Sequence, residues 1–523
     1  MPTALAPAVP SAASSGHPAL PSAAASANPL PWVAGVAMMA WVLFSPGVFS
    51  DGDTFWHVAA GEWILGHGAV PHADPFSHTR PGAPWVAHEW LTEALMALAY
   101  RAGDWLGGGG GWGGVVALTA AAAGLAFGQL ARHLGRVLSP APVLFLLLLA
   151  ASCLRPVLLA RPHIVTLPVL ELWVATLFLA RADGRGPPWR LLPLMTLWAN
   201  MHGGFIVGLA LVAPLGLEAV LAAAREGPGR WRAAALRWGG FGAAAALAAC
   251  LTPHGPAGLL FPFYLSSMPD NIMLQEWQSP DFGIIQPIEM VLMAGLYVAL
   301  SRGATLPPVR LALLLGLLHL ALAHARHVTL VAVIAPFVVA GPLGQALAAR
   351  RSAAAPVGGE AAGRAGWRPA GGWRGWGLAA AAVLVALRLA LPVTPGTAAT
   401  APAAALAHVP PALAAQPVFN EYGFGGFLIH AGVRPFVDGR ADMYGSDFMH
   451  RYWAVQAPDK AALDKAIAEY GIRWTLLPPG SPVVQLLDLM PGWCRLYADD
   501  RAVVHQACGD ATLAAQADGT PRP

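Results

Sequence analysis

The sequence predicts an α-helical polytopic membrane protein with a small C-terminal α/β soluble domain. Hydrophobic residues make up 56% of the 523-residue chain and charged residues only 11%, whereas about a quarter of the residues in a soluble domain are charged. The mean hydropathy is +0.53, so most of the chain needs the bilayer as its solvent. Apolar runs of nearly spanning length recur until about residue 391 and then give way to a mixed pattern. We therefore expect roughly ten to twelve membrane helices.

The chain is expected to have three parts. Residues 1–29 are rich in Ala, Pro and Ser and contain no Lys, Arg, Asp or Glu, so they are expected to form a disordered tail. Because no basic segment precedes the first apolar run, we expect that run to remain as a membrane helix and not to act as a signal peptide. A membrane domain should cover residues 30–391, with an outer loop at 51–87, and an α/β domain should cover residues 392–523.

The membrane domain is defined by its apolar runs. The longest of them could form a hairpin of two helices, whereas several others are too short to cross the bilayer alone. The runs cover residues 30–50, 88–100, 112–131, 142–153, 157–180, 191–224, 233–251, 284–300, 311–323, 328–340 and 376–391.

The charged connections predict the sidedness of the chain. Four connections carry arginine clusters, which the positive-inside rule places in the cytoplasm; these clusters account for the net charge of +3 and do not form a nucleic-acid patch. The loop 51–87 has four acids against one arginine, and residues 252–283 have three acids and no Lys or Arg. Both loops, and the domain after residue 391, are therefore expected on the outer face of a bacterial inner membrane. The run 88–100 fits only as a partial or juxtamembrane helix, because a full crossing would place Arg132 and Arg136 outside.

Two aspartates begin the first outer loop. Asp51 and Asp53 follow directly after the first membrane helix, where carboxylates are costly unless they serve a function. One carboxylate can take a proton from an acceptor hydroxyl, and two can hold a divalent metal ion against a phosphate. The alternative is that both cap the next helix.

That next helix is expected over residues 54–65. It should lie in the membrane interface, with Trp56 and Trp63 as anchors. Asp53 and His57 are four residues apart, so they would share one face of this helix.

The first outer loop resembles that of the GT-C glycosyltransferases. The resemblance lies in DGD after the first helix, an interfacial helix, a turn with Pro and then PWVAHEWLTEALMALAYRAG, and it is specific over residues 30–136. The most similar members are the lipid A aminoarabinose transferases and the protein O-mannosyltransferases. Those families show Asp followed by Glu where this chain has DGD, so the resemblance implies either Asp51 or Asp53 as the base.

The chain as a whole is similar to a widespread family of bacterial multi-pass membrane proteins. The segments that carry this likeness are DGDTFWH, ARPHIVT, LWANMHGGF, LTPHG, EWQSPDF and FGGFLIHAGVRPFVDGRADMYG. The GT-C resemblance implies transfer of a sugar from a polyprenyl-phosphate donor, held with membrane lipid, to an unknown acceptor on the outer face.

A polyprenyl-phosphate donor requires a cation near the phosphate. Arg155, Arg161 and Arg326 are the candidates, although Arg155 and Arg161 could instead snorkel to lipid headgroups. His57, His202 and Glu276 are further candidates for substrate contact. The alternative for the segment around His202 is helix packing by Gly203, Gly204 and Asn200, and the alternative for Glu276 and Trp277 is an outer-loop anchor.

Two other functions compete with glycosyl transfer. A transporter would need ionisable residues or broken helices at the bilayer midplane and an inverted repeat, whereas the charges here gather at the outer loops. A non-catalytic assembly factor would work through the C-terminal domain alone.

The C-terminal domain is expected to mix strands and helices. Its strands should lie at 417–422, 426–431, 434–437, 474–477 and within 493–506, and its helices at 448–456 and 460–470. The segment RPFVDGRADMYG gathers Asp438, Arg440, Asp442 and Tyr444, either for acceptor binding or as a structural Asp–Arg pair.

The four cysteines fall into two groups. Cys153 and Cys250 lie in or beside apolar runs and are expected to be core packing. Cys494 and Cys508 flank two strand-like runs around Asp499 and Asp500, which brings them roughly opposite each other in a hairpin. In an oxidising compartment this arrangement predicts a disulfide.

The sidedness can be tested with fusion reporters. A reporter that is active only outside the cytoplasm should be active when fused after Pro523. The same reporter should be inactive when fused near Ala354, because the arginine-rich segment there is expected inside. The reverse pattern would contradict the outer location of both the C-terminal domain and the predicted site.

Overall fold

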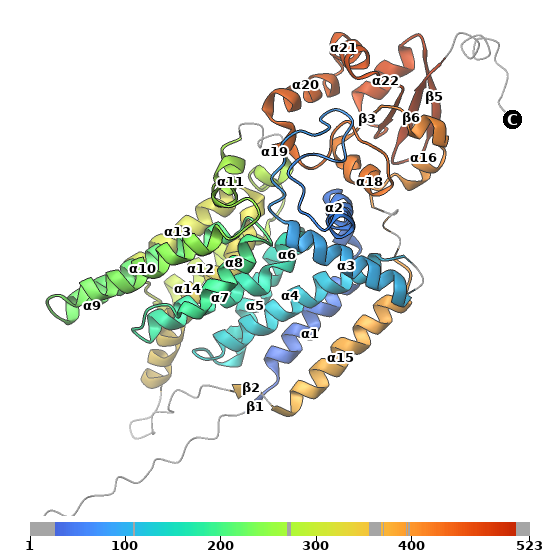
Figure 1. Cartoon of the computed structure of the whole chain (residues 1–523). Helices are drawn as coiled ribbons and strands as arrows, with labels where there is room; N and C mark the ends of the chain where they lie inside the picture. The colour runs from blue at the N-terminus through green and yellow to red at the C-terminus, as the bar shows by residue number, and fades with distance from the viewer. Residues whose placement is uncertain are drawn as a thin grey trace, which may run out of the picture.

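The long apolar helices lie side by side along a common direction, and the C-terminal sheet lies beyond one end of them (Figure 1). The computed structural model describes residues 27–107, 110–268, 274–354, 368–369, 371–393, 395 and 398–508. Residues 1–26 of the predicted tail 1–29 lie outside the described residues, whereas residues 27–28 form a short strand. The chain is a helical membrane protein with a small C-terminal α/β domain, as the sequence predicted.

Five of the described helical segments are long and apolar enough to cross a membrane, and three shorter helices are also apolar. The five segments are 112–134, 140–157, 205–226, 325–349 and 373–390, and the shorter ones are 30–43, 287–301 and 308–323. The helices of this part are α1 Leu30–Leu43, α2 Asp53–His67, α3 Trp90–Gly107, α4 Trp112–Leu134, α5 Pro140–Leu154, α6 Pro162–Val165, α7 Leu167–Ala182, α8 Leu192–Ala199, α9 Phe205–Glu226, α10 Arg230–Ala249, α11 Pro256–Ser267, α12 Pro287–Arg302, α13 Pro308–Ala323, α14 Val328–Ala354 and α15 Gly371–Ala390.

Short 3₁₀ turns interrupt these helices at Pro46–Phe49, Arg155–Val157, Trp189–Leu191, Gln275–Trp277 and Ala325–His327. Two short strands, β1 Ala27–Asn28 and β2 Arg368–Pro369, pair in parallel.

Helices α1 and α4 are packed closely through glycine. A Cβ atom added to Gly35 would lie 2.9 Å from the carbonyl oxygen of Gly124, and one added to Gly128 would lie 3.1 Å from that of Pro31. Small residues spaced four apart let helix backbones approach in a membrane. The first membrane helix is therefore held firmly, and the acidic loop after it starts from a defined position.

The predicted hairpin within 191–224 is formed by α8 and α9. Asn200 lies in the turn, where its Oδ1 accepts a hydrogen bond from Trp90 Nε1 (2.8 Å) and its Nδ2 donates to the carbonyl of Leu251 (2.9 Å). The side chain thus joins three segments, which agrees with the packing alternative for this stretch.

Helices α2 and α3 pack against each other between the apolar helices and the C-terminal domain. The helix predicted over 54–65 is α2. Helix α3 is not among the apolar helices that could cross a membrane, and its ribbon runs across the common direction of α4 and α15 (Figure 1). This orientation agrees with the prediction that residues 88–100 form a partial or juxtamembrane helix and do not cross the bilayer fully.

The C-terminal domain is a four-stranded sheet with helices on both faces. The strand order is β3-β4-β6-β5, with β3 and β4 parallel and the other neighbours antiparallel. Side chains alternate between the faces: Phe419 and Leu477 face the core under α20–α22, whereas Val418 and Leu476 face the core under α16–α18. The elements are β3 Val418–Asn420, β4 Trp474–Leu477, β5 Trp493–Ala498, β6 Val503–Ala507, α16 Ala403–Ala407, α17 Pro411–Ala414, α18 Gly425–His430, α19 Ala441–Tyr444, α20 Ser446–Gln456, α21 Lys460–Tyr470 and α22 Pro482–Leu489.

Two predicted strands of this domain were wrong. The segment 426–431 belongs to α18, and 434–437 is an extended loop outside the sheet. Gly425 and Gly426 at the start of α18 lie against other backbone, so close packing decides the conformation of this apolar run. The helix α22 was not predicted. The predicted strands within 417–422, 474–477 and 493–506 and both predicted helices are confirmed.

The predicted disulfide between Cys494 and Cys508 is present, with 5.8 Å between the two Cα atoms. The hairpin register differs from the predicted one. Cys494 lies opposite Gln506, and an irregularity between Arg495 and Tyr497 shifts the pairing. Cys508 follows the last residue of β6 and reaches Cys494 from beyond the strand.

A buried charge cluster joins the first outer loop to the C-terminal domain. The Arg440 guanidinium contacts Asp438 and Asp74, each at 2.7 Å, and all three side chains are at most 1% exposed. The rings of Phe76 and Trp85 lie 5.1 and 4.8 Å from the guanidinium carbon. The structural Asp–Arg pair predicted from RPFVDGRADMYG is therefore present, with a second acid from 366 residues away.

Replacing Arg440 with Met should destabilise the protein by about 3–5 kcal/mol, because two buried carboxylates would lose their cation. The matched control is Arg495→Met, which removes a half-exposed arginine that contacts Asp488; an exposed pair contributes about 0–1 kcal/mol. Thermal denaturation of the purified protein checks both. Equal melting temperatures for the two variants would contradict the structural role of the Arg440 cluster.

Candidate functional site

Arg161 holds three carboxylates together at the end of the helical part nearest the C-terminal domain. Its Nη1 lies 2.7 Å from Asp51 Oδ2 and 3.2 Å from Glu276 Oε2, and its Nη2 lies 2.8 Å from Asp53 Oδ2. Arg161 stands in an irregular segment between the 3₁₀ turn at 155–157 and α6, where Pro162 begins the helix. The three acids come from two other loops, so the cluster exists only in the folded chain.

Asp51 and Asp53 are not equivalent in this cluster. Asp51 uses one oxygen for Arg161 and the other to accept a hydrogen bond from the Asp53 backbone N–H (2.8 Å). Asp51 therefore takes part in the helix-end role that the sequence offered as an alternative. Asp53 contacts Arg161 through Oδ2, while its Oδ1 faces Gly439.

Arg326 extends the cluster on the far side of Glu276. Its Nη1 lies 3.0 Å from Glu276 Oε1, and its guanidinium carbon lies 4.3 Å above the ring of Trp277. Two guanidinium groups thus share one carboxylate, and about a quarter of the Arg326 side chain is exposed. Trp277 is buried, so its expected role as an interfacial anchor was wrong: it supports Arg326 by a cation–π contact.

The cluster shifts the pKa values of its acids in opposite directions. Burial, together with Asp51 and Glu276, raises the pKa of Asp53 to about 7, although Arg161 acts against this shift. Burial alone would raise the pKa of Glu276, but Arg326 and Arg161 outweigh it and lower the pKa to about 2. Near neutral pH, Asp53 can therefore take up or release a proton, whereas Glu276 stays ionised.

Glycines of the C-terminal domain form the wall behind the acidic loop. A Cβ atom on Gly52 would lie 2.0 Å from the Gly423 carbonyl oxygen, and one on Gly426 would lie 2.1 Å from the Gly52 carbonyl oxygen. A Cβ atom on Gly439 would lie 1.8 Å from Asp53 Oδ1. The motifs FGGF and DGR therefore need glycine because they touch the DGD segment directly.

A second group of polar side chains lies beside this cluster, centred on Glu89. Glu89 Oε1 is 3.4 Å from His202 Nε2 and 3.7 Å from His88 Nε2, and Glu89 Oε2 is 3.7 Å from His57 Nε2. Burial raises the pKa of Glu89 to about 7, against the effect of Arg161 and Arg326. His57 Nδ1 in turn lies 3.2 Å from Glu93 Oε1.

Sequence reasoning missed Glu89 and Glu93. Both fall in the stretch 88–100, which was interpreted only as an apolar run. Two glutamates four residues apart at the start of a helix were the available signal, because they project from one face. The predicted residues His57 and His202 both reach this group.

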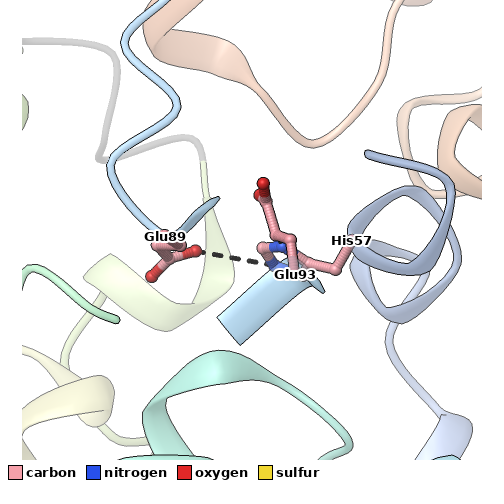
Figure 2. A group of neighbouring side chains, drawn as sticks. All are labelled: His57, Glu89 and Glu93. Carbon is pink, nitrogen blue, oxygen red and sulfur yellow. Dashed lines mark hydrogen bonds and ion pairs between the residues drawn. The ribbon is translucent and has the colours of Figure 1, made fainter. Parts of the chain in front are cut away.

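The structure also locates the remaining predicted residues. Arg155 is exposed, and no ion pair involves it within the described residues. Trp56 was expected to anchor in the interface, but it is buried against Trp85 in the core shared with the C-terminal domain. Asp51 and Asp53 were considered as metal ligands, but the cation they contact is the Arg161 guanidinium. In the described part of the chain, the group that could hold a metal ion is His57, Glu89 and Glu93, whose ligand atoms lie within 4.8 Å of one another (Figure 2).

Comparison with known proteins identifies the fold. No protein-family model and no curated protein sequence matches the chain. Among solved structures, an oligosaccharyltransferase AglB from Archaeoglobus fulgidus with an inhibitory peptide and a dolichol-phosphate matches 86% of this chain and 69% of its own at a TM-score of 0.50 and 9% identity. An oligosaccharyltransferase from Archaeoglobus fulgidus that is tethered to an acceptor peptide matches 85% of this chain and 68% of its own, at a TM-score of 0.50 and 11% identity. The chain has the GT-C fold.

A third solved structure, ArnT from Cupriavidus metallidurans bound to undecaprenyl phosphate, matches 92% of this chain and 98% of its own at a TM-score of 0.48 and 12% identity.

The contact between Gly439 and Asp53 can be tested by a double-mutant cycle. Gly439→Ala should lower stability by about 1–3 kcal/mol, as overpacking typically does. Part of this cost should disappear when Asp53 is also replaced by Ala, because the clashing carboxylate is then absent and the contact with Trp56 Nε1, 2.8 Å from the added Cβ, remains. Gly480→Ala is the control, since no atom lies within 4 Å of its added Cβ. Additive changes in the melting temperature would contradict the contact.

Proposed function

We propose that the protein is a glycosyltransferase that moves a sugar from a polyprenyl-phosphate donor to an acceptor hydroxyl on the outer face of the membrane. The observation that carries this proposal is the cluster in which Arg161 and Arg326 share Glu276 beside Asp51 and Asp53. It combines an acid that can take a proton with two cations that can face a phosphate. The GT-C fold and the resemblance of the first outer loop support the same reaction class.

Asp53 is the proposed base. Its pKa of about 7 suits proton transfer near neutral pH, whereas both oxygens of Asp51 are engaged in the bonds described above. In the proposed step Asp53 takes the proton of the acceptor hydroxyl, and the oxygen attacks the anomeric carbon of the sugar. The bond between that carbon and the phosphate oxygen breaks, and the lipid phosphate leaves with the bonding electron pair. Such a single displacement inverts the configuration at the anomeric carbon.

Arg326 is the proposed partner of the phosphate, with the Arg161 guanidinium on the other side of Glu276. The leaving phosphate gains charge during the step, and preformed cations in a partly desolvated site stabilise that charge. Arg326 is partly buried and, within the described residues, pairs with one carboxylate oxygen, that of Glu276, so part of its guanidinium fork remains for a phosphate. Arg161 is saturated by three acids, and it would contribute mainly by holding Asp53 in place. The AglB structure that shares the fold was solved with dolichol-phosphate, which is consistent with a lipid phosphate donor here.

Replacing Asp53 with Asn should lower transfer by about 10²–10⁴-fold, because it removes the base but keeps a side chain of the same shape. In the unmodified protein, kcat/KM should rise as the pH rises through about 7, because only the deprotonated Asp53 accepts a proton. Transfer is measured with purified protein and a panel of polyprenyl-phosphate hexoses and pentoses.

The matched control for this test is Glu62→Gln, which alters a partly exposed acid of the same helix that contacts Arg101. It should leave transfer unchanged. Full activity in both Asp53→Asn and Asp51→Asn would assign the two aspartates to capping and would favour a non-catalytic assembly role.

A further inference from the structure

The group formed by His57, Glu89 and Glu93 lies between α2 and α3, apart from the carboxylates that Arg161 holds. His57 projects from α2, while Glu89 immediately precedes α3 and Glu93 stands in its first turn. Figure 2 shows the Glu89 carboxylate facing the His57 ring. The His57 and Glu93 side chains are each 1% exposed, and that of Glu89 is 12% exposed.

The hydrogen bonds of His57 orient its ring toward Glu89. Its Nδ1 lies 3.2 Å from Glu93 Oε1, so this nitrogen carries the proton and donates to the carboxylate. The lone pair of Nε2 then points at Glu89 Oε2, 3.7 Å away. Within the described residues, this buried Nε2 and the buried Glu93 Oε2 have no hydrogen-bond partner. A lone pair facing a carboxylate without a cation between them is unfavourable.

His88 repeats this arrangement on the other oxygen of Glu89. Its Nδ1 lies 3.3 Å from the carbonyl oxygen of Val86, to which it must donate. Its Nε2 therefore turns a lone pair toward Glu89 Oε1, 3.7 Å away. His202 behaves differently, because its Nδ1 accepts a hydrogen bond from the Gly204 N–H, so its Nε2 carries the proton and can donate to Glu89. His202 thus acts as a partner of the carboxylate and not as a ligand.

The separations fit a bridging metal ion better than direct hydrogen bonds. A hydrogen bond between nitrogen and oxygen has a length of about 2.7–3.2 Å. Two ligand atoms bound to zinc at about 2.0–2.1 Å lie about 3.3–3.5 Å apart at a tetrahedral angle, and farther apart at wider angles. Metal-binding histidines also usually donate their other ring N–H to a carboxylate or a backbone carbonyl, as His57 and His88 do here.

We propose that His57 Nε2 and Glu89 bind one divalent transition-metal ion of the zinc class, with His88 as a further ligand candidate and with Glu93 as the acceptor that orients the His57 ring. One or two imidazoles with a carboxylate suit zinc better than magnesium, which prefers oxygen ligands alone. The ion would fasten α2 to α3 one helical turn after Asp53. It would thereby position the proposed base without taking part in the chemistry.

Metal content tests this site without any donor or acceptor, so the result does not depend on the proposed transfer. The full chain is purified without a polyhistidine tag, stripped with a chelator and re-equilibrated with Zn²⁺ in the presence of excess Mg²⁺. We expect about one zinc per chain by elemental analysis and a higher melting temperature in the zinc-loaded protein.

Two variants and one control locate the ion. Glu93→Gln keeps the shape of the side chain, and His57→Gln removes the imidazole; each should weaken zinc binding by at least the 10–100-fold that loss of a second-shell partner costs (about 1.4–2.7 kcal/mol). Glu171→Gln is the control, because Glu171 is another buried acid that bonds a histidine, His133, directly at 2.7 Å. It should bind zinc as the unmodified protein does.

X-ray absorption of the zinc-loaded protein decides the result even if a variant fails to fold. The spectrum should show nitrogen and oxygen ligands with imidazole scattering. Sulfur ligands, less than a tenth of an ion per chain in the unmodified protein, or equal zinc affinity in Glu93→Gln and the control would overturn the proposed site. If no metal binds, a proton shared between His57 Nε2 and Glu89 Oε2 would have to take the place of the ion.

Discussion

The arrangement of the site depends on one buried guanidinium. Arg161 contacts Asp51, Asp53 and Glu276 in a region of low dielectric, where three carboxylates without a cation would repel one another and lose their solvation. Because the acids come from loops far apart in sequence, this single charge sets the distance between the end of α1 and the loop before α12. Arg326 continues the network through Glu276 and leaves part of its own charge open. The same field separates the pKa values of Asp53 and Glu276 and so gives two similar groups different chemical roles.

The C-terminal domain is part of the site and not an appended module. Its glycines at 426 and 439, together with Gly52 of the loop itself, allow close contact between the domain and the acidic loop where any larger residue would collide. The buried Arg440 lies between the same two parts of the chain. It pairs with Asp74 of the loop 51–87 and with Asp438 of the C-terminal domain. Close backbone packing and a desolvated ion pair act together here, since the ion pair requires exclusion of water and the glycines make that exclusion possible. A movement of this domain would therefore move Asp53.

Part of the site around the first outer loop could be predicted from the sequence. The position of DGD directly after an apolar helix was sufficient to single out Asp51 and Asp53, and a need for cations pointed to Arg161 and Arg326. The same reasoning passed over Glu89 and Glu93, because a window averaged over 88–100 is apolar even though it contains these two acids at the start of α3. It also assigned Trp56 and Trp277 to the membrane interface, since aromatic residues near helix ends usually lie there; both are instead covered by neighbouring segments. The strand predicted over 426–431 failed because its glycines serve contact with Gly52 and not local backbone preference.

The sequence by itself determined the class of the fold, the hairpin at 191–224, most elements of the C-terminal sheet and the disulfide. These features follow from hydropathy, arginine distribution and residue alternation, which act over short stretches of chain. Only the tertiary structure decided which charges meet. Arg161 and Asp51 are 110 residues apart, and Arg440 and Asp74 are 366 residues apart. Such pairs form because burying an unpaired charge costs free energy. That cost arises only after the helices and the C-terminal domain have excluded water from the space between them.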